Sequence, residues 1–243
     1  MAVQPILAFD IYGTLLSFEV VTQQLEHYLD DSARARTVSQ TWRRYQLEYT
    51  WRLNSMGRYQ PFLDVTKNAL VHALADTDAR LSADEIEHLM ATYNSLSPFP
   101  DVDDALTQLT NLPQTRAVIF SNGTQDMVSK CVDRTPSLSR HRNFFQAIIS
   151  ADEVGQYKPA PDVYKHLAAR VGKHHSGMQE IWLVSGNPFD VAGALNVGMK
   201  TIWVARDQAP WTDRALPDLK PTATVHSLGQ VVDVIRDRVS QYS

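Results

Sequence analysis

Carboxylates, hydroxyls, amides and an ammonium group follow short apolar runs at several places in this sequence. They are Asp10, Ser121, Asn122, Lys158, Ser185, Asn187 and Asp190. A carboxylate beside a lysine ammonium stays ionised and can act as a nucleophile or a base. Taken singly, these residues are ordinary in turns, loops and helix starts, so the hypothesis of a site depends on their joint placement. The pattern predicts one site with two carboxylates and a lysine.

The elements that must position these residues are short and buried. Apolar runs typical of buried strands occupy 6–9, 117–120, 147–149, 181–184 and 201–204. Helical patterns follow at 124–134, 161–171, 190–197 and 227–239. Strands that alternate with helices predict an α/β fold, a Rossmann-like, doubly wound parallel sheet covered on both faces. Ligands of such sheets bind outside the carboxyl ends of the strands, where the polar residues above lie.

The first two core segments are unusually far apart. Ser121 follows Asp10 by 111 positions, whereas a βαβ unit takes roughly 30 residues, so about 70–80 residues are surplus. This surplus has helical patterns at 18–30, 37–56, 61–75 and 82–95, the last starting with a capping box at Ser82–Glu85. Asp101, after Pro98-Phe99-Pro100, is expected to cap the next helix. We therefore predict a helical cap domain, residues 17–98, inserted into a Rossmann-like catalytic core, residues 1–16 and 99–243.

Composition excludes several classes of protein. The chain has 243 residues, 44% of them hydrophobic, and a net charge of -4, which gives no basic surface for nucleic acid or an anionic membrane. Cys131 is the single cysteine, so a disulfide framework is excluded; it is expected to be a small apolar filler in a helix. The N-terminus lacks the basic region of a secretory signal, and no apolar run reaches the ~18 residues of a membrane span. We expect a cytoplasmic protein.

Four segments resemble the motifs of the haloacid dehalogenase superfamily, in the same order and covering most of the chain. The first is Asp10-Ile11-Tyr12-Gly13-Thr14-Leu15 and the second is Phe120-Ser121-Asn122-Gly123. The third runs from Tyr157-Lys158-Pro159 to Tyr164, and the fourth from Val184-Ser185-Gly186-Asn187 to Asp190 and Ala194. The surplus helical segment resembles the cap that these proteins insert after the first motif.

Two positions distinguish between the chemistries of that superfamily. Its phosphatases carry a second acid two positions after the nucleophile, which protonates the leaving group, and another acid that helps to hold Mg²⁺. This chain has Tyr12 and Ser185 at those positions. A neutral hydroxyl binds Mg²⁺ far more weakly than a carboxylate does. We therefore expect neither a metal nor another cofactor, and phosphate chemistry is disfavoured.

The pattern resembles instead the L-2-haloacid dehalogenases of type II. Thr41-Trp42-Arg43-Arg44-Tyr45-Gln46-Leu47 is similar to the family's cap helix, in which the arginine after the tryptophan reaches the site. Arg43 and Arg44 point about 100° apart on a helix, so one of them faces the cleft.

The resemblance implies hydrolysis of a short L-2-haloacid to a D-2-hydroxyacid through an ester on Asp10. The resemblance implies that Lys158 orients Asp10 and that Asp190 activates the water. It also implies that three polar side chains order either this water or Asp10, namely Thr14, Ser185 and Asn187. Tyr164 is implied to support this set of residues. The implied contacts of the 2-substituted carboxylate substrate are Ile11, Tyr12, Arg43, Leu47, Phe62, Ser121, Asn122 and Phe189.

Some residues depart from the family pattern, and other functions stay open. The family often has tryptophan at Phe189, serine at Gly186 and alanine at Pro188, so the substrate wall is expected to differ. A related activity opens azetidine-2-carboxylate with the same nucleophile. A phosphatase and a non-catalytic binding protein are the remaining alternatives. The resemblance also allows a homodimer.

Overall fold

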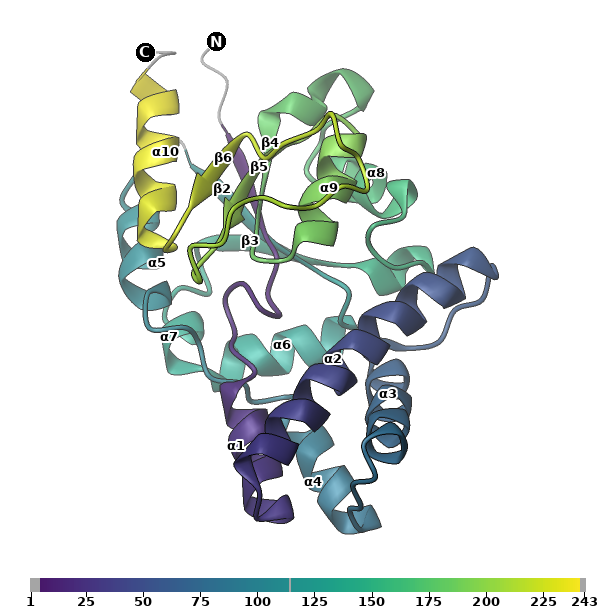
Figure 1. Ribbon diagram of the computed structural model, residues 1–243. Coiled ribbons are helices and arrows are strands. Elements are labelled where there is room, and N and C mark those ends of the chain that lie inside the picture. The colour runs from purple at the N-terminus through teal and green to yellow at the C-terminus, as the bar shows by residue number, and fades with distance from the viewer. Residues whose placement is uncertain (1–4, 114, 241–243) are drawn as a thin grey trace.

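Six parallel strands form one sheet in the computed structural model, which describes residues 5–113 and 115–240 (Figure 1). The order is β3-β2-β1-β4-β5-β6. Every residue of β1 and β4, the two central strands, is buried, as expected where both faces of a parallel sheet are covered. The bounds are β1 Ile6–Phe9, β2 Arg116–Ser121, β3 Phe145–Ser150, β4 Ile181–Ser185, β5 Lys200–Val204 and β6 Ala223–Val225.

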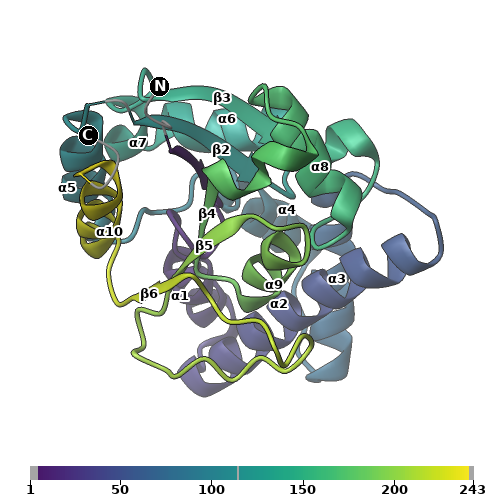
Figure 2. The same ribbon diagram turned by 90° about the horizontal axis from the view of Figure 1, so that it is seen from above.

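Helices cover the two faces of this sheet (Figure 2). Alternate residues of each strand point to opposite faces. Leu7 and Phe9 of β1 therefore join the apolar cluster that includes α5 (Val102–Thr110), α6 (Gln125–Arg134), α7 (Pro136–Ser139) and α10 (Gly229–Ser240). Ile6 and Ala8 join the cluster that includes α8 (Pro161–Arg170) and the end of α9 (Pro188–Asn196). The doubly wound, Rossmann-like architecture predicted from the sequence is confirmed.

Four further helices lie between β1 and β2 in the chain and form a layer beside the sheet (Figure 1). They are α1 Glu19–Leu29, α2 Ser32–Ser55, α3 Phe62–Asp76 and α4 Ala83–Thr92. Their buried apolar residues, such as Leu25, Trp42 and Leu70, pack in one cluster. The Ser82–Glu85 capping box predicted for α4 is present. The exact division into a cap at 17–98 and a core at 1–16 and 99–243 stays a prediction.

The two connections between this layer and the sheet run side by side. Leu16 forms an isolated antiparallel bridge with Pro98, and the amide of Ser17 donates to the carbonyl of Ser97 at 2.8 Å. Asp101 directly precedes α5, but its side chain makes no capping hydrogen bond, contrary to the sequence expectation. Its carboxylate instead accepts hydrogen bonds from the Arg206 guanidinium at 2.9 and 3.0 Å and from the Leu228 amide at 2.8 Å. This acid therefore ties the second connection to the segments after β5 and β6.

Most predicted elements are present within one to three residues of their expected bounds. The short strand β6 and the four-residue helix α7 are not among the elements predicted from the sequence. Two short 3-10 helices, η1 (Ala151–Val154) and η2 (His175–Glu180), precede α8 and β4. Among residues 5–113 and 115–240, none of the helices has the length and apolarity needed to cross a membrane.

Candidate active site

The predicted polar residues gather at the carboxyl ends of three adjacent strands. Asp10 directly follows β1, Ser121 ends β2 and Ser185 ends β4, and these strands are neighbours in the order β2-β1-β4. Lys158 comes from the loop after η1, and Asp190 comes from the first turn of α9. Strand order thus brings together residues that lie up to 180 positions apart in the chain, as expected for this kind of sheet.

Asp10 receives hydrogen bonds from three side chains. Its Oδ2 accepts from the Thr14 hydroxyl at 2.6 Å and from Nδ2 of Asn187 at 2.8 Å. Its Oδ1 accepts from Nζ of Lys158 at 3.2 Å. The residue is 6% exposed, so the carboxylate is largely shielded from water. These donors fix its orientation, and Oδ1 is the less engaged of its two oxygens.

Lys158 is a buried ammonium with an acceptor for each of its three N–H groups. Nζ donates to Asp10, to Oδ2 of Asp190 at 2.8 Å and to the carbonyl of Phe120 at 2.8 Å. It also lies 4.1 Å from the centroid of the Phe120 ring. A buried charge is tolerated only when it is paired and hydrogen-bonded. Lys158 therefore fixes the relative position of the two carboxylates.

Asp190 is fully buried and accepts hydrogen bonds from both Lys158 and Tyr164. Its Oδ1 accepts from the Tyr164 hydroxyl at 2.8 Å. Burial raises the pKa of the Asp190 carboxyl above its usual range, against the opposing effect of the Lys158 ammonium. Burial likewise raises the pKa of the Tyr164 phenol well above its usual value, which keeps it a donor. At Gly193 an added Cβ would lie 2.4 Å from the Tyr164 hydroxyl, so this glycine makes room for the tyrosine.

Hydroxyl and amide side chains stabilise the loops around Asp10. The Thr14 hydroxyl accepts from the Gly186 amide at 2.9 Å, and the Ser185 hydroxyl accepts from the Asn187 amide at 3.1 Å. Oδ1 of Asn122 accepts from the Lys158 amide at 2.8 Å. The Ser121 hydroxyl, fully buried, accepts from the amide of Gly123 at 3.0 Å. In the described part of the chain, no three His, Cys, Asp or Glu side chains are grouped so as to hold a metal ion.

Arg43 joins the helical layer to this site. From α2, its Nη2 donates to Oδ1 of Asn187 at 3.0 Å, and the same Asn187 donates to Asp10. The guanidinium also lies 4.9 Å from the centroid of the Phe18 ring. Arg44 is exposed and lies 3.5 Å from Asp76 instead. Arg43 is thus the arginine of the pair that faces the site.

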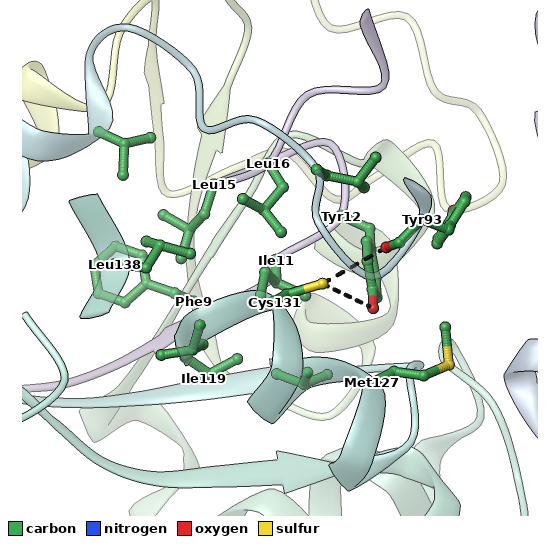
Figure 3. Packing of buried hydrophobic residues seen from close by; sticks show 14 of the residues in the cluster. Phe9, Ile11, Tyr12, Leu15, Leu16, Tyr93, Ile119, Met127, Cys131 and Leu138 are labelled. Carbon is green, nitrogen blue, oxygen red and sulfur yellow. Dashed lines mark hydrogen bonds between the residues drawn. The ribbon is translucent and has the colours of Figure 1, made fainter. Parts of the chain in front are cut away.

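The predicted apolar residues divide into two groups. Ile11, Tyr12 and Phe62 are buried, and the Tyr12 ring lies 5.9 Å from the Phe62 ring and 5.4 Å from the Tyr93 ring. Figure 3 shows the Tyr12 hydroxyl beside the thiol of Cys131, at 3.9 Å. Burial raises the pKa of Tyr12 well above its usual value.

The second group of predicted apolar residues is half-buried and consists of Leu47 and Phe189. Leu47 lies one turn after Arg43 in α2, and the Phe189 ring packs edge-on against the Trp51 ring, with 5.8 Å between their centroids.

An open cavity lies on the helical-layer side of Arg43. Its volume is about 270 Å³. Its lining residues are Phe18, Val21, Ser39, Gln40, Trp42, Arg43, Gln46 and Tyr93. Gln46 has no role predicted from the sequence; it is 1% exposed and donates and accepts hydrogen bonds inside this layer. The helical spacing could have indicated that Gln46 is buried, because it lies four residues after Trp42 and four before Thr50, which are both buried in α2.

The fold and the arrangement of Asp10, Lys158 and Asp190 agree with the comparison with known proteins, which places the chain among the hydrolases. Residues 5–198 match the family model for haloacid dehalogenase-like hydrolases, so the chain belongs to that family. It is 34% identical over 200 residues to an (S)-2-haloacid dehalogenase of Xanthobacter autotrophicus, which covers 82% of this chain and 74% of that protein. It is 33% identical to (S)-2-haloacid dehalogenase 1 of Pseudomonas sp. strain CBS-3, covering 92% of this chain and 94% of that one.

Solved structures agree with this assignment. The L-2-haloacid dehalogenase of Xanthobacter autotrophicus with chloropropionic acid covalently bound matches with a TM-score of 0.81 and 29% identity. The match covers 96% of this chain and 98% of that one. The family resemblance read from the sequence is therefore confirmed.

Proposed function

We propose that the protein hydrolyses short L-2-haloacids to D-2-hydroxyacids through an ester formed on Asp10, without a metal ion. The observation that carries this proposal is the buried Asp10 carboxylate, held by Thr14, Asn187 and Lys158 with one oxygen less engaged than the other. The names of the relatives, (S)-2-haloacid dehalogenases, support the substrate class. So does a similar structure described as having chloropropionic acid covalently bound.

In the first step Oδ1 of Asp10 attacks C2 of the haloacid. The new C–O bond forms as the carbon–halogen bond breaks, and its electron pair leaves with the halide, which inverts the carbon. Displacement at an sp³ carbon needs a shielded, correctly aimed carboxylate. Asp10 meets this requirement because it is 6% exposed and its orientation is fixed by its three donors. Ile11, Tyr12, Leu47, Phe62 and Phe189 form the proposed apolar wall.

The leaving halide and the substrate carboxylate both need hydrogen-bond donors. Arg43 and Asn122 are proposed to stabilise the halide as its charge develops, since charge-assisted donors are the strongest. A preorganised donor of this kind typically contributes about 3 kcal/mol to lowering the barrier. Ser121 and the backbone amides after Asp10 are proposed to bind the substrate carboxylate.

In the second step water attacks the ester carbonyl of Asp10 and restores the carboxylate. Asp190 is proposed to accept the proton of this water, and its raised pKa makes it a stronger base than an ordinary aspartate. Tyr164 and Lys158 hold Asp190 in place. Thr14, Ser185 and Asn187 order the water or Asp10.

A phosphatase is the alternative from the same family, and two residues disfavour it. A phosphatase needs an acid at position 12, and the Tyr12 phenol, its pKa raised by burial, is a poor proton donor. Ser185 offers a hydroxyl where such enzymes place a Mg²⁺-binding acid, and its oxygen already accepts from the Asn187 amide. We therefore propose metal-independent turnover.

The test is halide release from L-2-chloropropionate and chloroacetate in the presence of EDTA, with azetidine-2-carboxylate and a phosphate ester assayed in parallel. We expect halide release that EDTA leaves unchanged. Ring opening of azetidine-2-carboxylate without halide release would assign the related hydrolase activity, and Mg²⁺-dependent phosphate release would assign a phosphatase. Absence of turnover with every substrate at high enzyme concentration would contradict the proposal and favour a binding protein.

A further inference from the structure

Gln46 is a buried amide that accepts a hydrogen bond from Arg43, the arginine of α2 that faces the site. It lies in α2, three residues after Arg43, and is 1% exposed. Its Oε1 accepts a hydrogen bond from Nη1 of Arg43 at 2.6 Å. The other guanidinium nitrogen, Nη2, donates to Asn187 at 3.0 Å. The guanidinium is thus held between an acceptor on its own helix and an acceptor at the sheet.

The orientation of the Gln46 amide follows from hydrogen-bond counting. A threonine hydroxyl has one hydrogen, and that of Thr66 is donated to the carbonyl of Phe62 at 2.7 Å. Thr66 can therefore only accept from Gln46, whose Nε2 lies 2.7 Å away. Nε2 must face Thr66, and Oε1 must face Arg43. The second Nε2 hydrogen has the Tyr93 hydroxyl as its acceptor at 3.0 Å.

Thr66 is itself held in place by the neighbouring helix. It is fully buried in α3, and its carbonyl accepts from Nε1 of Trp42 at 2.7 Å. Two hydrogen bonds to Thr66, one from Trp42 and one from Gln46, therefore link α2 to α3 on either side of Arg43 in the chain. The position of Oε1 is set by packing between two helices and does not depend on solvent.

Arg43 needs such a restraint because open space lies beside it. The cavity of about 270 Å³ also borders Ser39 and Gln40, which offer polar groups to a guanidinium that turns away from Asn187. An arginine side chain has several rotatable bonds and loses conformational entropy when it is fixed. A hydrogen bond to Oε1 restricts the guanidinium to the direction of Asn187.

We propose that Gln46 is a positioning residue for the dehalogenation step: it holds the Arg43 guanidinium where the halide leaves. This role rests on the proposed function, because it assigns Arg43 to the leaving halide. Gln46 hydrogen-bonds to Arg43, Thr66 and Tyr93. In this role its effect on the reaction passes through Arg43, which makes the two residues energetically coupled.

The test is a double-mutant cycle. Gln46→Met keeps the length of the side chain and removes the acceptor. We expect kcat for L-2-chloropropionate to fall about 30-fold with KM changed less than about threefold, because the donor is misplaced mainly for the charge that develops at the leaving halide. In Arg43→Ala enzyme, the same substitution should lower kcat less than about twofold, because there is no guanidinium left to position.

Thr66→Val and Thr66→Ser form a matched pair that tests the same role without altering Gln46. The valine variant loses the acceptor that orients the amide and should lose part of kcat, whereas the serine variant keeps a hydroxyl and should retain most of it. Unfolding temperatures separate these effects from loss of structure. The positioning role would be overturned if the Gln46→Met enzyme had the same kcat as the wild type. It would also be overturned if Gln46→Met lowered kcat equally in the wild-type and the Arg43→Ala enzyme. Neither result would contradict the proposed function. If the wild-type enzyme releases no halide, that result contradicts both the proposed function and the positioning role of Gln46.

Discussion

Arg43 and Asn187 are 144 positions apart in the chain and are joined by a hydrogen bond of 3.0 Å from the guanidinium to the side-chain oxygen. The amide nitrogen of the same Asn187 donates to Asp10 at 2.8 Å. One asparagine therefore connects a helix of the inserted layer to the proposed nucleophile. Substrate binding between the two layers is expected to place the halide near this connection, where Arg43 can reach it.

Removal of the Thr14 hydroxyl should impair the orientation of Asp10. Thr14→Val loses the donor to Oδ2 and the acceptor for the Gly186 amide. Hydrogen bonds to charged groups contribute about 1.5–3 kcal/mol, so kcat should fall about 10- to 100-fold. Thr14→Ser keeps the hydroxyl and is the control. Equal kcat values for the valine and serine variants in a steady-state halide assay would show that this contact has no effect on turnover.

Loss of the Tyr164 hydroxyl should slow hydrolysis of the ester more than its formation. Tyr164→Phe removes the donor to Asp190, the proposed base of the second step. The covalent intermediate should then accumulate on Asp10 and be visible by mass spectrometry of enzyme quenched during turnover. The steady-state rate should fall about 10- to 100-fold, as expected for one hydrogen bond to a charged group. A slower halide burst without accumulation would instead assign Tyr164 to the first step.

Gly186 should not tolerate a side chain. An added Cβ would lie 2.5 Å from the carbonyl oxygen of Gly13, which is backbone and cannot turn aside. We expect Gly186→Ala to lower the free energy of unfolding by about 1–3 kcal/mol, the usual cost of forced overpacking. Gly229→Ala is the control, because its Cβ would meet only Ser227 Oγ at 3.7 Å. Urea denaturation of both variants measures the difference, and equal midpoints would contradict the expectation.

Alkaline pH should destabilise the protein through its buried tyrosines. Burial raises the pKa of Tyr93 to about 12 and raises that of Tyr12 and Tyr164 well above the usual value. A tyrosine in the unfolded chain ionises near about pH 10. Since the folded-state pKa is the higher one, its stabilising effect is complete below about pH 10 and is lost as the pH rises toward the folded value.

The free energy of unfolding should therefore decline above about pH 10. Urea denaturation across this range, with phenolate absorbance recorded in parallel, provides the measurement. In wild-type protein, ionisation of the buried tyrosines should coincide with unfolding. Ionisation of all tyrosines near their usual pKa in a protein that is still folded would contradict the burial of these phenols.

Residues next to strand ends were predictable from sequence, whereas residues that act between helices were not. Asp10, Ser121 and Ser185 directly follow apolar runs, so their meeting at one edge follows from the parallel sheet. The site role of Arg43 came from the family resemblance, because a helix arginine is otherwise a common surface residue. Gln46 escaped notice because its partners Thr66 and Tyr93 come from other segments of the chain. The sequence predicts Asp101 as a helix cap, whereas the structure gives its carboxylate Arg206 and Leu228 as partners.

The proposed ester on Asp10 is tested most directly by a single turnover in H₂¹⁸O with enzyme in excess over L-2-chloropropionate. Water that attacks the ester carbonyl leaves its oxygen in Asp10, while the product keeps an oxygen that came from the protein. We predict heavy oxygen in the peptide that contains Asp10, unlabelled lactate of the D configuration, and no turnover by Asp10→Ala enzyme. Label in the lactate with none in Asp10 would show direct attack of water on C2 and would contradict the mechanism.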